Sequence, residues 1–129
     1  MRTVYLNTIN PDDLLIKRVL YQNRILLVRQ ITTKRLGTWL NGYLEIKPGD
    51  KIDLLLDRQK HNLAPNLREI TFEGQVIIND EKLNNLFIGF DNAEPIYKHE
   101  TVDDVLNDLK AYLQYGRYFK VEKDKDGKI

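Results

Sequence analysis

Apolar and polar residues alternate along two stretches in the second half of the chain, as they do in strands buried on one face. These stretches, residues 69–78 and 85–91, are separated by the polar residues 79–82, which have the composition of a turn. Gly74 and Gly89, one in each stretch, fit a sheet that curls towards a barrel. The pattern predicts an antiparallel hairpin with Ile70, Phe72, Gly74, Val76 and Ile78 on one face of the first strand and Leu86, Ile88 and Phe90 on one face of the second.

The first third of the chain allows two interpretations after an expected strand over residues 3–8. Asn10, Pro11 and the acids that follow have the chemistry of a helix start, which would make a helix to about residue 21. The alternative is a strand over residues 15–21 that turns at Gln22 and Asn23 and pairs with residues 24–33. We favour the hairpin, because β-branched and aromatic residues are frequent here.

The middle of the chain is expected to form the centre of the sheet. Residues 38–46 are predicted to be one extended, bulged strand, although Asn41 and Gly42 would also suit a two-residue turn. Pro48 and Gly49 then predict a turn. The residues after it alternate, which predicts a strand over residues 51–57 followed by an exposed loop over 58–67; the apolar positions of this strand are Ile52, Leu54 and Leu56.

The end of the chain contains one clear helical signal. Thr101 and Asp104 resemble a capping box, and Gly116 suits the residue after the last turn. Residues 117–122 are predicted to add a short strand. The helix is expected over residues 102–115, with an apolar stripe formed by Val102, Val105, Leu106, Leu109 and Leu113.

Together these elements predict an α+β domain. Its centre is a curved antiparallel sheet or small β-barrel of about six to seven strands, covered by one C-terminal amphipathic helix. Residues 1–122 are expected to form this single domain, because 129 residues suit one core and no linker interrupts them. Residues 123–129 are expected to be a charged flexible tail.

Composition restricts the chemistry. The chain has no cysteine and no serine, so disulfides and the common serine and cysteine nucleophiles are excluded. It has no apolar run of about 18 residues and no signal peptide at its start, so a cytoplasmic protein that does not enter a membrane is expected. We also expect no enzymatic activity and no cofactor.

Charge is unevenly distributed along the chain. Residues 1–37 carry seven Lys or Arg against two acids, a net charge of +5, whereas residues 38–129 carry thirteen against seventeen, a net charge of −4. A basic region of this kind suits an anionic ligand or an acidic partner surface. A second basic stretch, residues 58–68, would extend the region if it folds nearby. The candidate binding residues are Arg24, Arg29, Lys34, Arg35, Arg58 and Lys60.

Other motifs are weak. Residues 122–129 resemble the beginning of an EF-hand calcium loop, but position one is Glu and the chain stops before the final ligand. His61 and His99 have no metal-binding spacing, so no metal site is predicted. Asp53 and Asp57 are interpreted as solubilising acids and not as catalytic carboxylates.

Two short resemblances involve the middle of the chain. The layout of residues 31–91, with PGD before an alternating strand and a closing IGFD, is similar to the later strands of PilZ domains. That resemblance implies a barrel that binds cyclic di-GMP through R-x-x-x-R and D-x-S-x-x-G segments. Residues 30–37 contain neither segment. The sequence LEIKPGDKI also looks like the swapped-hairpin DNA-binding domains of the AbrB type, without their preceding proline-containing strand.

The sequence therefore predicts a small binding or regulatory module that is not an enzyme. It would contact a protein or an anionic ligand, such as a nucleotide or nucleic acid, through an N-terminal basic face. Two alternatives remain. One is a structural or assembly protein that forms homo-oligomers through its sheet edges, and the other is a degenerate PilZ-like nucleotide-binding barrel.

Overall fold

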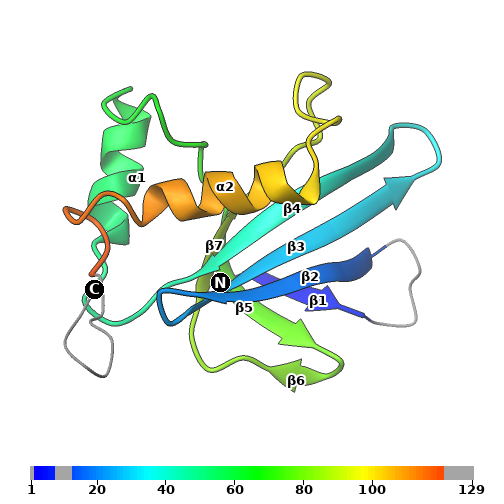
Figure 1. The fold of residues 1–129 in the computed structure, drawn as a ribbon, viewed down its shortest axis with the longest axis horizontal. Coiled ribbons are helices and arrows are strands. Elements are labelled where there is room, and N and C mark those ends of the chain that lie inside the picture. The colour runs from blue at the N-terminus through cyan, green and yellow to red at the C-terminus, as the bar shows by residue number, and fades with distance from the viewer. Residues whose placement is uncertain (1, 8–12, 121–129) are drawn as a thin grey trace.

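The computed structural model describes residues 2–7 and 13–120, and it contains one strongly curled sheet with two helices (Figure 1). The strand order is β1-β5-β7-β4-β3-β2, and the short β6 pairs with β5. The predicted α+β class with a curved sheet is confirmed, with two additions: β1 pairs parallel to β5, and there is a second helix. The elements are β1 (Arg2–Leu6), β2 (Asp13–Tyr21), β3 (Arg24–Thr33), β4 (Gly37–Glu45), α1 (Ile52–Lys60), β5 (Phe72–Ile78), β6 (Glu81–Lys82), β7 (Phe87–Phe90) and α2 (Val102–Tyr112).

The β2–β3 hairpin confirms the strand interpretation of the first third. Tyr21 pairs with Arg24 across the turn residues Gln22 and Asn23, whose φ angles are 48° and 62°. Positive φ at both positions is the requirement of a type I′ turn, which matches the twist of the flanking strands. A bulge next to Leu15 interrupts the register. Residues 8–12, where the alternative helix would have begun, lie outside the described residues.

The strand predicted for residues 51–57 is wrong, because this segment begins helix α1. The turn itself is confirmed, with Gly49 at φ 95°. Ile52 and Leu55 are buried three residues apart, whereas Leu54 is 39% exposed, so the apolar face has a helical period and not a period of two. The expected loop over residues 58–67 is correspondingly shorter, because α1 continues to Lys60.

The second predicted hairpin is confirmed by the antiparallel pairing of β5 with β7. A side chain larger than that of glycine does not fit at position 74 in β5, because a Cβ there would lie 2.2 Å from the carbonyl oxygen of Arg2. Only glycine therefore allows β1 to approach β5 closely enough to pair with it.

Helix α2 confirms the predicted capping box: the Thr101 hydroxyl accepts the Asp104 N–H, and the Asp104 carboxylate accepts the Thr101 N–H. The helix ends at Tyr112, three residues earlier than predicted. The short strand predicted for residues 117–122 is wrong over the described residues 117–120, which form turns and a bend. Tyr118 and Phe119 are nevertheless buried there, in the core. Residues 121–129, with the predicted tail, lie outside the described residues.

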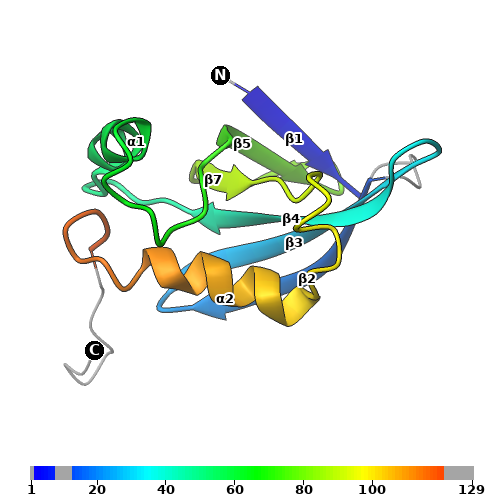
Figure 2. The ribbon, with the colours of Figure 1, turned by 90° about the horizontal axis from the view of Figure 1, so that it is seen from above.

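The two faces of the sheet bury separate apolar clusters. One cluster lies between the sheet and both helices and includes Leu26, Leu44, Leu55 and Leu109. The other lies on the opposite face, in the hollow of the curled sheet, and includes Leu6, Leu27, Tyr43 and Phe72. Figure 2 shows α2 along one face, with β1 and β5 curled over the other. The curl also brings the two edge strands close at one point, where the Leu15 N–H donates to Asn7 Oδ1 (3.0 Å).

Candidate functional site

Of the six predicted binding residues, Arg24 is buried. It is 2% exposed and lies at the start of β3, where two of its N–H groups donate to the Asp50 carboxylate at 2.5 and 2.8 Å. The remaining guanidinium contacts are the carbonyl oxygens of Glu45 (3.1 Å) and Lys120 (2.9 Å) and the ring of Phe119. All of these partners belong to the protein, so Arg24 is a structural residue and presents no surface to a ligand.

Arg29 is also engaged internally. Its Nε donates to Asp13 on the neighbouring strand β2, and Nη1 donates to the Tyr43 hydroxyl (2.8 Å). Partial burial opposes a charge on Arg29, but the hydrogen bonds and charge interactions with Asp13 and Tyr43 together outweigh that effect and raise the pKa of the guanidinium. For Tyr43 burial acts in the other direction: it raises the pKa of the hydroxyl, which therefore stays protonated. Arg29 therefore ties β2, β3 and β4 together at one side of the hollow.

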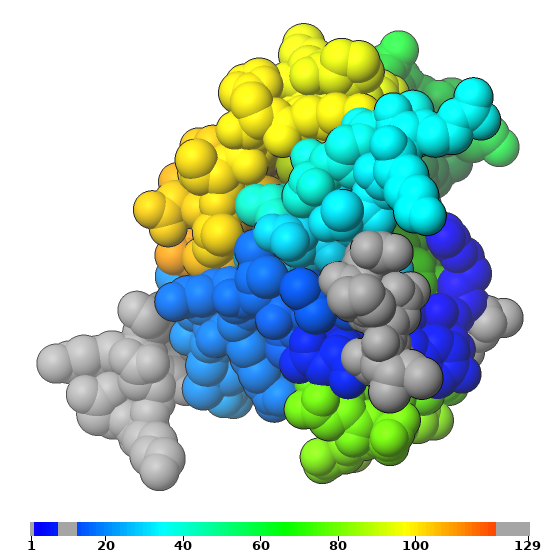
Figure 3. Space-filling view, turned by 90° about the vertical axis from the view of Figure 1, so that its right-hand side faces the viewer, coloured from blue at the N-terminus to red at the C-terminus, as the bar shows by residue number. Residues whose placement is uncertain are grey.

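Lys34 and Arg35 differ, because both are exposed at the turn of the β3–β4 hairpin. No carboxylate of residues 2–7 or 13–120 pairs with either side chain. The turn that carries them is ordered by Thr33: its hydroxyl accepts the Leu36 N–H (2.9 Å) and donates to the Gly37 carbonyl (3.2 Å). Gly37 completes the turn with φ 86°. Figure 3 shows this hairpin, in cyan, projecting from the end of the molecule.

Lys98 joins this hairpin from a distant part of the chain, and sequence reasoning did not find it. Its ammonium donates to the Leu36 carbonyl and lies 5.2 Å from the centre of the Trp39 ring. The segment that leads to α2, in yellow, runs beside the hairpin in Figure 3. Lys98 adds a third cation to the turn, but no spacing in the sequence links two positions 62 residues apart.

Arg58 and Lys60 are not brought to the hairpin. They lie on α1, which is at the opposite end of the molecule from the β3–β4 turn in Figures 1 and 2. The sequence-based idea that residues 58–68 would extend the basic region is wrong for this reason. Arg68 is likewise occupied, because it pairs with Glu100 (3.2 Å) and Asp108 (3.4 Å).

The Arg68 guanidinium lies in an aromatic cage. Its central carbon is 3.7 Å from the ring centre of Tyr97 and 4.5 Å from that of Phe90. Burial, and then the neighbouring Asp108, raise the pKa of Glu100 above its ordinary value. The cluster fastens the segment before α2 to the segment that leads into β5.

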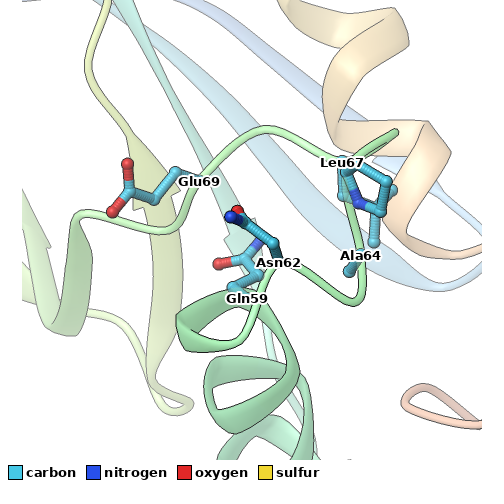
Figure 4. A pocket seen from close by; sticks show the side chains of 6 residues that line it. Gln59, Asn62, Ala64, Leu67 and Glu69 are labelled. Atoms are coloured by element: carbon cyan, nitrogen blue, oxygen red, sulfur yellow. The ribbon is translucent and has the colours of Figure 1, made fainter.

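Two adjoining hollows lie near this cluster. The first, about 300 Å³, lies where α1 ends, and Figure 4 shows Gln59 and Asn62 between Glu69 on one side and Ala64 and Leu67 on the other. The second, about 340 Å³, shares Pro65, Leu67 and Glu69 with the first and is also lined by Tyr97 and Asp108. The Gln59 amide is already used, because it donates to the Arg68 carbonyl (2.8 Å) and accepts the Ile70 N–H (3.0 Å). The walls of these hollows are therefore polar, but the Gln59 amide and the Arg68 guanidinium that line them already bond to other groups of the protein.

A third hollow of about 280 Å³ opens at the side of the curled sheet, between β1 and the β3–β4 hairpin. Arg2 and Arg29 line it together with Asn41, Tyr43 and Asp91. Arg2 is held against Phe72, 5.4 Å from the ring centre, and donates to the Thr71 carbonyl (2.8 Å). Charges of both signs line this hollow, so it does not select an anion.

The described part of the chain contains neither a metal-binding cluster nor a helix that could span a membrane. Residues 2–7 and 13–120 contain no cluster of three His, Cys, Asp or Glu side chains able to hold a metal ion. His61 is exposed and contacts Asp57, and the EF-hand-like residues 122–129 lie outside the described residues. Neither α1 nor α2 has the length and apolar character needed to cross a bilayer.

Apart from Arg2, which donates to the Thr71 carbonyl, the exposed cations of strands β1 to β4 and their turns that pair with no carboxylate of residues 2–7 or 13–120 are Lys17 and Arg18 on β2 and Lys34 and Arg35 at the hairpin turn. We call them the four unpaired cations. They are the part of the predicted basic face that is open to a partner. No family model matches the chain, and searches among curated proteins and solved structures found no similar protein.

Proposed function

We propose that this domain is a non-enzymatic binding module that contacts an anionic partner through the four unpaired cations. The observation that carries the proposal is the position of Lys34 and Arg35, which are exposed at the end of a projecting hairpin and pair with no carboxylate of the described residues. Arg24, Arg29, Arg58 and Lys60 are not part of it, because the first two bind internal acids and the others lie on α1.

The hairpin turn suits this role energetically. The two Thr33 hydrogen bonds and the positive φ of Gly37 define the backbone before a partner arrives. At this turn a partner therefore has to order the Lys34 and Arg35 side chains but not the backbone, at about 0.5–1.5 kcal/mol for each side chain. Exposed charges of this kind mainly raise the rate of association and set its dependence on salt.

The test is a binding assay with the full chain and three polyanions: poly-L-glutamate, duplex DNA and single-stranded RNA. Fluorescence anisotropy is measured between about 50 and 200 mM salt, the range over which electrostatic binding weakens strongly. The test variant combines Lys34→Glu with Arg35→Glu. The matched control combines Lys82→Glu with Arg117→Glu, because both side chains are exposed and lie away from the β3–β4 turn.

We expect at least one polyanion to bind in a salt-dependent way, with about tenfold weaker binding by the test variant and less than about twofold change in the control. The proposal fails if no polyanion binds at low salt. It also fails if both double variants lose binding equally, because the loss would then follow net charge and not the hairpin.

A further inference from the structure

Among the described residues, no strand pairs with the outer edge of β2. The strand order places β2 at one end of the sheet, with β3 as its only hydrogen-bonded neighbour among the described strands. On the other side the Leu15 N–H is satisfied by Asn7, and no other backbone bond is formed across this edge between described residues. Within the part of the chain that the structure describes, residues 17–21 therefore form a strand edge without a pairing partner.

The register identifies the backbone groups that face outwards. Tyr21 and Arg24 flank the two-residue turn and exchange hydrogen bonds, and pairs along an antiparallel ladder alternate between bonded and non-bonded. Leu20, opposite Ile25, and Arg18, opposite Leu27, are consequently the non-bonded pairs. Their N–H and C=O groups point away from β3, where an added strand would bind.

The side chains along this edge combine charge with exposed apolar surface. Lys17 and Arg18 are exposed and belong to the four unpaired cations. Leu20 is 69% exposed and Ile16 is 38% exposed. Lys17 and Arg18 are consecutive, so they point to opposite faces of the sheet. An added strand would meet one cation on each of its faces and an apolar side chain two residues further along.

These features argue against a second copy of this chain as the occupant. Two β2 strands pairing edge to edge would bring four cations together, and basic side chains on edge strands are a common protection against such pairing. Nucleic acid is also a poor fit: its phosphates can accept the outward N–H groups, but they cannot donate to the outward C=O groups and they make no apolar contact with Leu20. An extended acidic segment of another protein can hydrogen-bond to the outward N–H and C=O groups, pair its acids with Lys17 and Arg18, and place an apolar side chain against Leu20.

We propose that β2 is a docking edge for an acidic, extended peptide segment, which adds to the sheet as a further strand beside Arg18 and Leu20. This inference rests on the proposed function and names the class of its partner: a protein segment with acidic residues opposite Lys17 and Arg18 and an apolar residue beside Leu20.

The probe is a synthetic peptide of about eight residues, the length of a typical strand, with two adjacent glutamates followed by alternating valine and threonine. A second peptide replaces both glutamates with lysine. Binding to the full chain is measured by anisotropy, and amide hydrogen exchange is followed by NMR. We expect the acidic peptide alone to bind and to slow exchange at the Arg18 and Leu20 amides.

Two variants distinguish the contribution of the backbone hydrogen bonds to peptide binding from the contribution of the charged side chains. Leu20→Pro removes an outward N–H without removing a ladder bond to β3, and proline is tolerated at such edge positions. Its control, Leu20→Thr, keeps that N–H. We expect about tenfold weaker peptide binding for Leu20→Pro and for Lys17→Glu with Arg18→Glu, and less than about threefold for Leu20→Thr. Circular dichroism checks that each variant remains folded.

The inference is overturned if the acidic peptide does not bind, or if it binds equally to Leu20→Pro and Leu20→Thr. The proposed function survives that result when polyanion binding still depends on Lys34 and Arg35, so the two failures are distinguishable. Slower exchange at Arg18 and Leu20 caused by duplex DNA, with no effect of the peptide, would assign the edge to nucleic acid and would also overturn the inference.

Discussion

Arg24 and Asp50 form a doubly hydrogen-bonded ion pair, at 2.5 and 2.8 Å, between the start of β3 and the turn before α1. Their side chains are only 2% and 1% exposed. Asp50 also accepts the backbone N–H groups of Lys47 (2.7 Å) and Lys120 (3.3 Å). The pair therefore holds together three segments that are distant in the sequence, and it explains why a predicted ligand-binding arginine is absent from the surface.

The first prediction concerns this pair. Asp50→Ala leaves the buried Arg24 cation without its carboxylate, which costs about 3–5 kcal/mol of the free energy of unfolding. Urea unfolding at neutral pH measures the loss. The control is Asp53→Ala, which removes an exposed carboxylate from the first turn of α1 and should cost less than about 1 kcal/mol. A loss of less than about 1 kcal/mol for Asp50→Ala would contradict the structural role of the pair.

The second prediction tests the helical assignment of residues 52–60. Leu55 is fully buried whereas Leu54 is 39% exposed. Leu55→Ala should therefore lower the free energy of unfolding by about 2–5 kcal/mol, and Leu54→Ala by less than about 1 kcal/mol. The strand predicted from the sequence requires the opposite order, because it places Leu54 inside with Ile52. Thermal and urea unfolding of the two variants decide between them.

The third prediction concerns the parallel pairing of β1 with β5. Gly74→Ala places a Cβ 2.2 Å from the Arg2 carbonyl oxygen, so β1 has to move away. We expect a loss of about 1–3 kcal/mol, together with faster amide exchange along β1. Gly116→Ala is the control, since nothing lies within 4 Å of its Cβ position. Unchanged exchange in β1 after Gly74→Ala would show that the two strands do not pair as described.

The fourth prediction is a pH dependence at Glu100. Burial, and then the neighbouring Asp108, raise the pKa of Glu100 in the folded state. A carboxyl whose pKa is raised by folding stabilises the protein most below its unfolded pKa, about 4.3, and this contribution is lost as pH rises through the folded pKa. The stability of the wild type relative to Glu100→Gln should therefore increase as pH falls from neutral to about 4.

Asp104 provides a control of opposite sign. Its bonds to the backbone and side chain of Thr101 lower the pKa of its carboxyl, so its contribution is present above the unfolded pKa and disappears as pH falls through the folded one. The stability of the wild type relative to Asp104→Asn should decrease over the same pH range. Parallel trends for the two variants would contradict the assignment of the Glu100 cluster.

Local features of the fold were predictable from the sequence because their signals are local. The turn residues Gln22 and Asn23 lie between the strands that they join, and Thr101 and Asp104 cap the helix that follows them. The segment containing Ile52, Leu54 and Leu55 was misassigned for a physical reason. Its apolar residues satisfy both a period of two and a period of 3.6, and only packing against the core decides between them.

The candidate site was less predictable, because burial and pairing depend on contacts between distant residues. No residue near Arg24 in the sequence indicates that it pairs with Asp50, and Lys98 contacts the hairpin turn from a position 62 residues away. The exposure of Lys34 and Arg35 depends on local contacts instead, because Thr33 and Gly37 define the turn that carries them. The basic region of the sequence therefore overestimates the number of cations that a partner can reach.

The most direct test of the proposed binding surface is an NMR titration of the ¹⁵N-labelled full chain with poly-L-glutamate at low salt. We expect the amide shifts to concentrate at the Lys34–Arg35 turn and along the outer edge of β2 at Lys17 and Arg18, and to disappear at high salt. Shifts centred on Arg58 and Lys60 of α1, or no shifts at any ratio of polyanion to protein, would contradict the proposed binding surface.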